Sequence, residues 1–256
     1  MAKKIVIIST NIIRGVLTEN QDVHKKFYAS LTDNIIIAFS VITFVQLKQH
    51  EEMLEKLVAF CVKYSAVLIS DCDKIYTLEK KFYPHKMPND QIILYRFENT
   101  QEEETEMLEY FKSKEFKKGT TKLVQGQKKA LKDFDKTQKM YLKHNLEQKE
   151  IAWVVSTSLD DKEKIKIHEN IILNQWGMAS EILRTLIEYY KYAIKRTDIE
   201  ESDPFDLGIL SCTPYVDIVL TENTHAAILR NLKKTYLPLK NLKVYTMENL
   251  KENSFD

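Results

Sequence analysis

Near its C-terminus the chain reads Tyr215-Val216-Asp217-Ile218-Val219-Leu220-Thr221-Glu222-Asn223. The β-branched run over residues 216–220 predicts a short buried strand, which ends at a hydroxyl and a carboxylate. The segments that follow predict a helix and a further strand, over residues 224–236 and 243–245. Because parallel strands need a crossover such as a helix between them, this alternation indicates a parallel α/β sheet.

The same alternation opens the chain. Residues 4–8 are an apolar, β-branched run that predicts a buried strand ending at Ser9-Thr10-Asn11, and residues 67–70 predict a second strand. Asp71 or Asp73 is expected to cap the helix that follows, because a carboxylate accepts hydrogen bonds from free N–H groups at a helix start. The other expected elements are helices over residues 20–31, 40–50, 51–64, 74–82 and 204–211 and a strand over residues 92–97.

The middle of the chain differs in composition. Residues 101–109 are acidic, whereas residues 112–143 hold eleven Lys against three acids. Helical spacing predicts two helical segments here and a long helix over residues 159–196, in which Ile167, Ile171 and Trp176 recur. We therefore predict a discontinuous α/β domain over residues 1–100 and 200–256, interrupted by a mostly helical insertion over residues 101–199.

Bulk composition argues against several classes of protein. With 38 basic and 37 acidic residues, any attraction to nucleic acid must come from local clusters of charge. Five Gly residues form no phosphate-binding loop, and three Cys residues without CxxC spacing argue against a disulfide framework or a thiolate zinc site. The six His residues lack ligand spacing and are expected to be structural or exposed. The first apolar run is too short for a signal sequence or a membrane span, so a reducing cytoplasm and no membrane contact are expected.

Polar residues follow the expected strands and helices at three places: Ser9-Thr10-Asn11, Gln46, and the stretch from Asp203 to Glu222. In an open parallel sheet the loops after the carboxyl ends of the strands gather into one crevice. Asp206 would enter that crevice from a helix start and Glu222 from a strand end, whereas Asp217 would point elsewhere. Two carboxylates there could hold a hydrated Mg²⁺ or Mn²⁺, which activates water and stabilises a phosphoryl transition state.

Four runs, taken in order, carry a family resemblance. They are Ile5-Val6-Ile7-Ile8-Ser9-Thr10-Asn11-Ile12-Ile13, Ser40-Val41-Ile42-Thr43-Phe44-Val45-Gln46-Leu47, Asp206-Leu207-Gly208-Ile209-Leu210-Ser211, and residues 215–223. Together they resemble the four motifs of PIN-domain ribonucleases. Ser9 and Gln46 stand where that family has an Asp and a Glu, whereas Asp206 and Glu222 keep the family's acids.

The resemblance implies a three-layer α/β/α fold with a central parallel sheet. It also implies a metal-dependent endoribonuclease, often an enzyme of RNA processing or a toxin held by an antitoxin. Mg²⁺ or Mn²⁺ would bind Asp206 and Glu222, with Asp203 as a further ligand. Ser9 and Gln46 would complete the metal's shell through water, and Asn11 would orient the phosphate.

The two neutral residues change what the resemblance implies. Each removes about one unit of negative charge that favours a divalent ion, so metal affinity should fall. Three explanations stay open: a natural pseudo-enzyme, a working site that recruits Asp203, Asp71 or Asp73 instead, or substitutions introduced to disarm a toxic nuclease.

Local reasons also account for several of these residues. Asp206 and Glu222 could be first-turn acids stabilised by the helix macrodipole, and Asp203 could be an N-cap before Pro204. In the basic segment the expected phosphate contacts are Lys118, Lys122, Lys128, Lys129 and Lys132. The alternative is a solvated helix surface. The alternative function is thus a catalytically inactive module of PIN ancestry that binds RNA or a protein.

Overall fold

The computed structural model describes residues 3–255 apart from 20, 23, 49, 84, 145–178, 196–197 and 252–253. The described residues form one six-stranded sheet in the order β4-β3-β2-β1-β5-β6. The edge strand β4 (Ile93–Arg96) runs antiparallel to its neighbour. The parallel strands are β1 (Lys4–Ile8), β2 (Ile35–Ser40), β3 (Val67–Ile69), β5 (Ile218–Leu220) and β6 (Lys243–Tyr245). The predicted α/β class with a parallel central sheet is confirmed.

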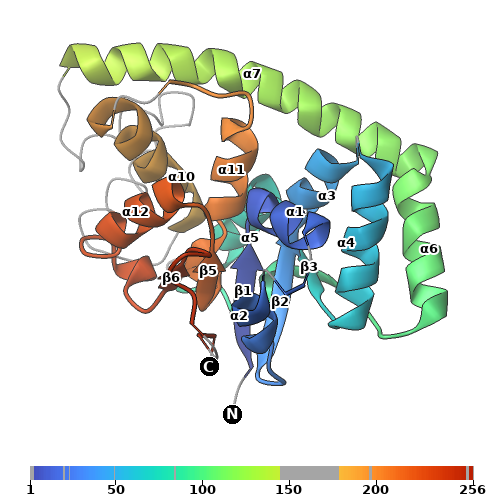
Figure 1. The fold of residues 1–256 in the computed structure, drawn as a ribbon. Coiled ribbons are helices and arrows are strands. Elements are labelled where there is room, and N and C mark those ends of the chain that lie inside the picture. The colour runs from blue at the N-terminus through green and yellow to red at the C-terminus, as the bar shows by residue number, and fades with distance from the viewer. Residues whose placement is uncertain are drawn as a thin grey trace.

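Helices cover both faces of the sheet (Figure 1). Along β1, Ile5 and Ile7 belong to one hydrophobic core and Val6 and Ile8 to another, because successive side chains of a strand point to opposite faces. The first core includes residues of α5 (Cys72–Phe82), α10 (Ala179–Tyr189) and α12 (Asn223–Leu232). The second includes residues of α1 (Thr10–Thr18), α3 (Val41–Leu47), α4 (Glu51–Lys63) and α6 (Gln101–Lys112).

One strand of the sheet was not predicted. The second strand in the chain is β2, which lies between β1 and β3, and the strand predicted over residues 67–70 is the third. Its residues Ile35-Ile36-Ile37-Ala38-Phe39 form a short continuous apolar run, whose periodicity does not distinguish a strand from a buried helix.

The first helix also differs from the prediction. Helix α1 begins at Thr10, where a turn was expected, and the helix predicted over residues 20–31 is limited to α2 (Lys25–Ala29). The segment after β1 is rich in β-branched residues, which have modest helix propensity. Burial of Ile13 and Val16 in the second core overrides that propensity.

The other elements lie within a few residues of the predicted bounds. Residues 204–211 were expected to be a helix, and α11 spans Asp203–Leu210. Short single turns complete the framework: η1 (Asn89–Ile92), the π-turn η3 (Tyr190–Ile194), η4 (Thr213–Tyr215) and η5 (Leu237–Leu239). None of the helices in the described ranges is long and apolar enough to cross a membrane.

The predicted helical insertion packs closely on the α/β unit. The two helical segments expected here are α6, in the acidic part, and α7 (Lys114–His144), in the basic part. Phe111 of α6 stacks on Phe44 with ring centroids 4.6 Å apart, and Leu186 of α10 is buried in the first core. Of the long helix predicted over residues 159–196, Ile167, Ile171 and Trp176 lie outside the described residues.

Helix α7 runs across the end of the molecule to which the parallel strands point (Figure 1). It contacts α6, which contributes to the second core, and α10 and α11, which contribute to the first. Its position places the basic segment over the carboxyl ends of the strands, where a site is expected in a fold of this kind.

Candidate functional site

The order of the strands reverses at β1. From β1 the chain builds β2 and β3 on one side, and it later returns to build β5 and β6 on the other. Ile8 pairs with Leu220, and the Ser9 N–H donates to the Leu220 carbonyl at 3.0 Å. The polar residues that follow β1 and β5 therefore lie side by side, at the point where open α/β sheets leave a crevice.

Glu222 lies at this crevice and contacts both neighbouring segments. Its Oε2 accepts a hydrogen bond from Asn11 Nδ2 at 3.1 Å, and its Oε1 lies 2.9 Å from His225 Nδ1. Although Glu222 is the N-cap residue of α12, its side chain makes no capping hydrogen bond. The hydrogen bond and charge of His225, aided by Asn11, lower the pKa of Glu222 to about 2. Glu222 is therefore ionised at physiological pH.

Asp206 shares the same electrostatic environment. It lies in the first turn of α11 and is 7% exposed. Burial raises its pKa to about 6, and the negative charge of Glu222 adds to this effect, whereas His225, Ser202 and Lys191 oppose it. The macrodipole explanation of Asp206 is incomplete, because a helix start alone would lower the pKa of a carboxyl. The charge of Glu222 acts on Asp206, and the prediction that the two acids form one site stays a prediction.

Ser9 and Gln46, the two neutral positions, differ in their contacts. Ser9 Oγ is buried and has no hydrogen-bond partner among the described residues, and the same holds for Thr221 Oγ1 at the end of the adjacent strand. Gln46 Oε1 instead accepts a hydrogen bond from Thr10 Oγ1. An unpaired buried hydroxyl is costly, so Ser9 and Thr221 are candidates for contact with a bound water or ligand.

Asp203 is hydrogen-bonded inside the protein through its carboxylate. It is completely buried, and its carboxylate accepts hydrogen bonds from Lys191 Nζ, from the Tyr192 hydroxyl at 2.7 Å and from the Glu200 N–H at 2.9 Å. Ser202, not Asp203, is the N-cap residue of α11, so the predicted capping role is wrong. The predicted role of Asp203 as a metal ligand finds no support in these contacts, because three donors already use its oxygens.

The other acids considered from the sequence lie outside this cluster. Asp71 caps α5 by accepting from the Lys74 N–H at 3.0 Å, which confirms the predicted cap. Asp73 follows in the first turn of the same helix. Asp217 accepts from the Ile5 N–H at 2.8 Å, at the opposite end of the strands, as expected.

The predicted phosphate-binding lysines lie on α7. Lys118, Lys122, Lys129 and Lys132 are exposed, and the side chain of Lys128 lies outside the described residues. Their spacing places these four on one face of the helix, opposite the buried Phe116 and Phe134. The arrangement fits both a solvated surface and a stripe of positive charge along an RNA backbone, so the prediction stays a prediction.

Two basic residues of the site were missed. His225 was expected to be structural or exposed, yet it is 2% exposed and paired with Glu222, and their i, i+3 spacing on a helix could have revealed it. Lys191 is buried in the π-turn η3, and its charge acts on both Asp206 and Glu222. No local pattern links Lys191 to residues in a different part of the chain.

The cluster offers a cation a limited set of oxygens. The carboxylates of Asp206 and Glu222 and the unpaired hydroxyls of Ser9 and Thr221 are suitable for Mg²⁺ or Mn²⁺. However, no group of three or more His, Cys, Asp or Glu residues within the described ranges is arranged to hold a metal ion. The predicted Mg²⁺ or Mn²⁺ at this place stays a prediction.

No protein-family model, no curated protein and no solved structure matches the chain. What this site can do therefore rests on its own geometry and charges.

Proposed function

We propose that the chain is a PIN-like endoribonuclease with a weakened metal site, acting in RNA processing or as a toxin. The observation that carries this proposal is the convergence of Asp206, Glu222 and Asn11 at the point where the strand order reverses. Three separate segments of the chain supply these residues. Such convergence at the carboxyl ends of parallel strands is typical of a site rather than of structural support.

The two carboxyl groups are suited to different tasks. Environments that push the pKa values of two neighbouring acids apart give those acids separate roles. Glu222, with a pKa of about 2, stays ionised and favours a bound cation. Asp206, with a pKa of about 6, gains its negative charge only as the pH approaches neutrality, so its contribution to holding a cation grows over that range. Asn11 holds Glu222 in place through its amide N–H.

A divalent ion held by Asp206, Glu222 and Ser9 would activate water and stabilise the charge that develops on the phosphate. Two features weaken such a site. Ser9 and Gln46 bring no charge, and Lys191 and His225 already offset part of the charge of the acids. We therefore expect an affinity for Mn²⁺ in the millimolar range, about the level of loosely held hard cations.

Cleavage of a fluorescent single-stranded RNA in the presence of Mn²⁺ tests the proposal. We expect slow cleavage that the Asp206→Asn and Glu222→Gln variants lose. Asp33→Asn is the matched control, because this exposed acid lies before β2, at the amino ends of the parallel strands. Cleavage that persists in the Asp206→Asn variant would place the activity elsewhere or in a contaminant.

A second candidate is a non-catalytic module that binds RNA. It is favoured by the hydrogen bond that occupies Gln46 Oε1 and by the row of exposed lysines on α7. Replacing Lys118, Lys129 and Lys132 by Gln should then reduce the slope of log affinity against log salt by about 0.7 per lost phosphate contact on a single strand. RNA that is retained without cleavage, with the expected change in slope, would support this function over the first.

A further inference from the structure

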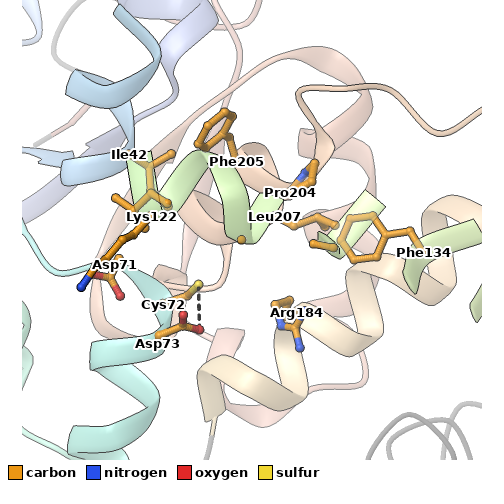
Figure 2. A pocket seen from close by; sticks show the side chains of 13 residues that line it. Ile42, Asp71, Cys72, Asp73, Lys122, Phe134, Arg184, Pro204, Phe205 and Leu207 are labelled. Atoms are coloured by element: carbon orange, nitrogen blue, oxygen red, sulfur yellow. Dashed lines mark hydrogen bonds between the residues drawn. The ribbon is translucent and has the colours of Figure 1, made fainter. Parts of the chain in front are cut away.

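A pocket of about 420 Å³ opens between α5, α7, α10 and α11 (Figure 2). This volume lies in the range of sites for small organic molecules. Most of its wall is apolar, and Figure 2 shows the rings of Phe134, from α7, and Phe205, from α11, on its sides. Flat apolar walls of this kind favour a planar ring system as ligand.

One side of the pocket is acidic. Asp71, Cys72 and Asp73 line it from the start of α5 (Figure 2). Asp71 uses Oδ1 for its cap on the Lys74 N–H, and Asp73 is exposed in the first turn of the helix. Burial raises the pKa of the Cys72 thiol to about 12, so this side chain is neutral. The Cys72 thiol donates a weak hydrogen bond to Asp73 Oδ1 at 3.9 Å (Figure 2), and since a carboxylate has about four acceptor positions, both oxygens of Asp73 can still accept from a ligand.

Two cationic side chains lie near these acids: Figure 2 shows Lys122 beside Asp71, and the charge of Arg184 acts on Asp73. The Arg184 guanidinium is held by both oxygens of Glu181, at 2.6 and 3.2 Å, and by Glu188 at 3.0 Å. Lys122 of α7 is exposed and lines the pocket near its opening. A ligand that carries both hydrogen-bond donors and a phosphate matches this mixture of charges.

The pocket adjoins the candidate site through one helix. Asp206 lies in α11 between Phe205 and Leu207, both of which line the pocket. An α-helix with its side chains is about 10–12 Å across, so the pocket and the carboxylate are separated by at most roughly this distance. One strand of nucleic acid can therefore reach both.

We propose that this pocket binds a guanine base of a single-stranded RNA, next to the phosphate that lies at Asp206 and Glu222. The inference rests on the proposed function and adds a preference for sequence to it. Phe134 and Phe205 supply the apolar walls, and Asp73 accepts hydrogen bonds from the edge of the base. Lys122 offers its charge to a neighbouring phosphate.

Guanine is favoured over the other bases by its donors. Its Watson–Crick edge carries two adjacent N–H donors, at N1 and N2, which match the two oxygens of a carboxylate. Adenine and cytosine carry an amino group beside an acceptor nitrogen, and uracil places one N–H between two carbonyls. These acceptor atoms would repel the oxygens of the carboxylate. In many RNA-binding sites the Watson–Crick edge of a single-stranded base is the edge that the protein contacts.

The chain offers a matched pair of variants for the test. Gly126 lines the pocket and Gly119 lies elsewhere on α7, and a Cβ at either position meets no atom within 4 Å. Replacement by Leu should strengthen the helix in both cases, because Gly is a poor helix former. Gly126→Leu fills the pocket, whereas Gly119→Leu leaves it open.

The experiment measures fluorescence anisotropy of two labelled RNA octamers in EDTA, one of uridine alone and one with a single central guanosine. We expect the guanosine to tighten binding about tenfold in the unmodified chain and in Gly119→Leu, in line with one bidentate contact. Gly126→Leu and Asp73→Asn should lose that preference while still binding both octamers.

The outcomes separate this inference from the proposed function. Equal binding of the two octamers by the unmodified chain, or a guanosine preference that survives in Gly126→Leu, would overturn the base pocket and leave the nuclease proposal standing. Failure of either octamer to bind, even at low salt, would overturn RNA as the substrate and the base pocket with it.

Discussion

Glu79 gives the sharpest test of how burial of charge affects this fold. It is 1% exposed, and its carboxylate accepts hydrogen bonds from the Ser180 N–H at 2.8 Å, from the Ser180 hydroxyl at 2.6 Å and from the Tyr215 hydroxyl. It thereby ties α5 to the start of α10. Burial raises its pKa from 4.5 to about 7, and the hydrogen bonds from Ser180 and Tyr215 only partly oppose this shift.

The sign of the effect on stability follows from proton binding. Between pH 4.5 and 7 the folded chain keeps a proton on Glu79 that the unfolded chain has lost, so stability falls as the pH rises through this window. At 1.36 kcal/mol for each pH unit, the loss between pH 5 and 8 is about 2.5 kcal/mol. Most of this loss is complete at pH 7, and it ends about one pH unit higher.

The Glu79→Gln variant isolates this contribution. Gln has nearly the same shape and does not titrate, so all other groups cancel in its difference from the unmodified chain. Urea unfolding followed by circular dichroism at pH 5 and pH 8 gives the two free energies of unfolding. We expect the unmodified chain to lose about 2.5 kcal/mol relative to the variant between these values. An equal difference at both pH values would refute the reasoning.

Substitutions of Phe44, Asn11 and Ser9 test the hydrophobic core and the candidate site. Phe44→Ala removes a fully buried ring stacked on Phe111 and should cost about 3–5 kcal/mol in urea unfolding, so a loss below about 1 kcal/mol would contradict the packing. Asn11→Ala removes a donor from Glu222, whose pKa should rise from about 2 in a carbon-13 NMR titration; an unchanged titration would show that His225 acts alone. Ser9→Asp should tighten Mn²⁺ binding by about tenfold or more in calorimetry, because an added charge near the ion contributes on the order of 1–4 kcal/mol, and unchanged affinity would count against a metal at this crevice.

Of the strands in the described residues, only β2 was not predicted from the sequence. The run Ile218–Leu220 lies between Asp217 and Thr221, so its identity as a strand is clear. The run of β2 passes directly into α3 through Ser40, which ends the strand and caps the helix by accepting from the Ile42 N–H at 3.2 Å. A strand and a helix that share one boundary residue leave no break in the apolar pattern.

Some residues of the candidate site could also be predicted from the sequence, and others could not. The neighbouring positions of Asn11 and Glu222 follow from the parallel pairing of β1 and β5, which the alternation of elements predicts. The cations beside the acids do not follow from it. Lys191 reaches the cluster from a π-turn, and its hydrogen bond to Asp203 depends on how α10 packs against α11. Tertiary packing of this kind has no signature in local spacing.

The contacts of the acids bear on why Ser9 and Gln46 are neutral. A site that recruits other acids would need carboxylates with free oxygens near Glu222. Asp203 accepts hydrogen bonds from Lys191, from Tyr192 and from a backbone N–H, and Asp71 caps α5. The charge of Lys191, held in place by Asp203, instead offsets that of Asp206 and Glu222. Asp203 also accepts hydrogen bonds from Tyr192 and from the Glu200 N–H, so it is fixed beside this buried lysine, which argues against its recruitment as a replacement ligand.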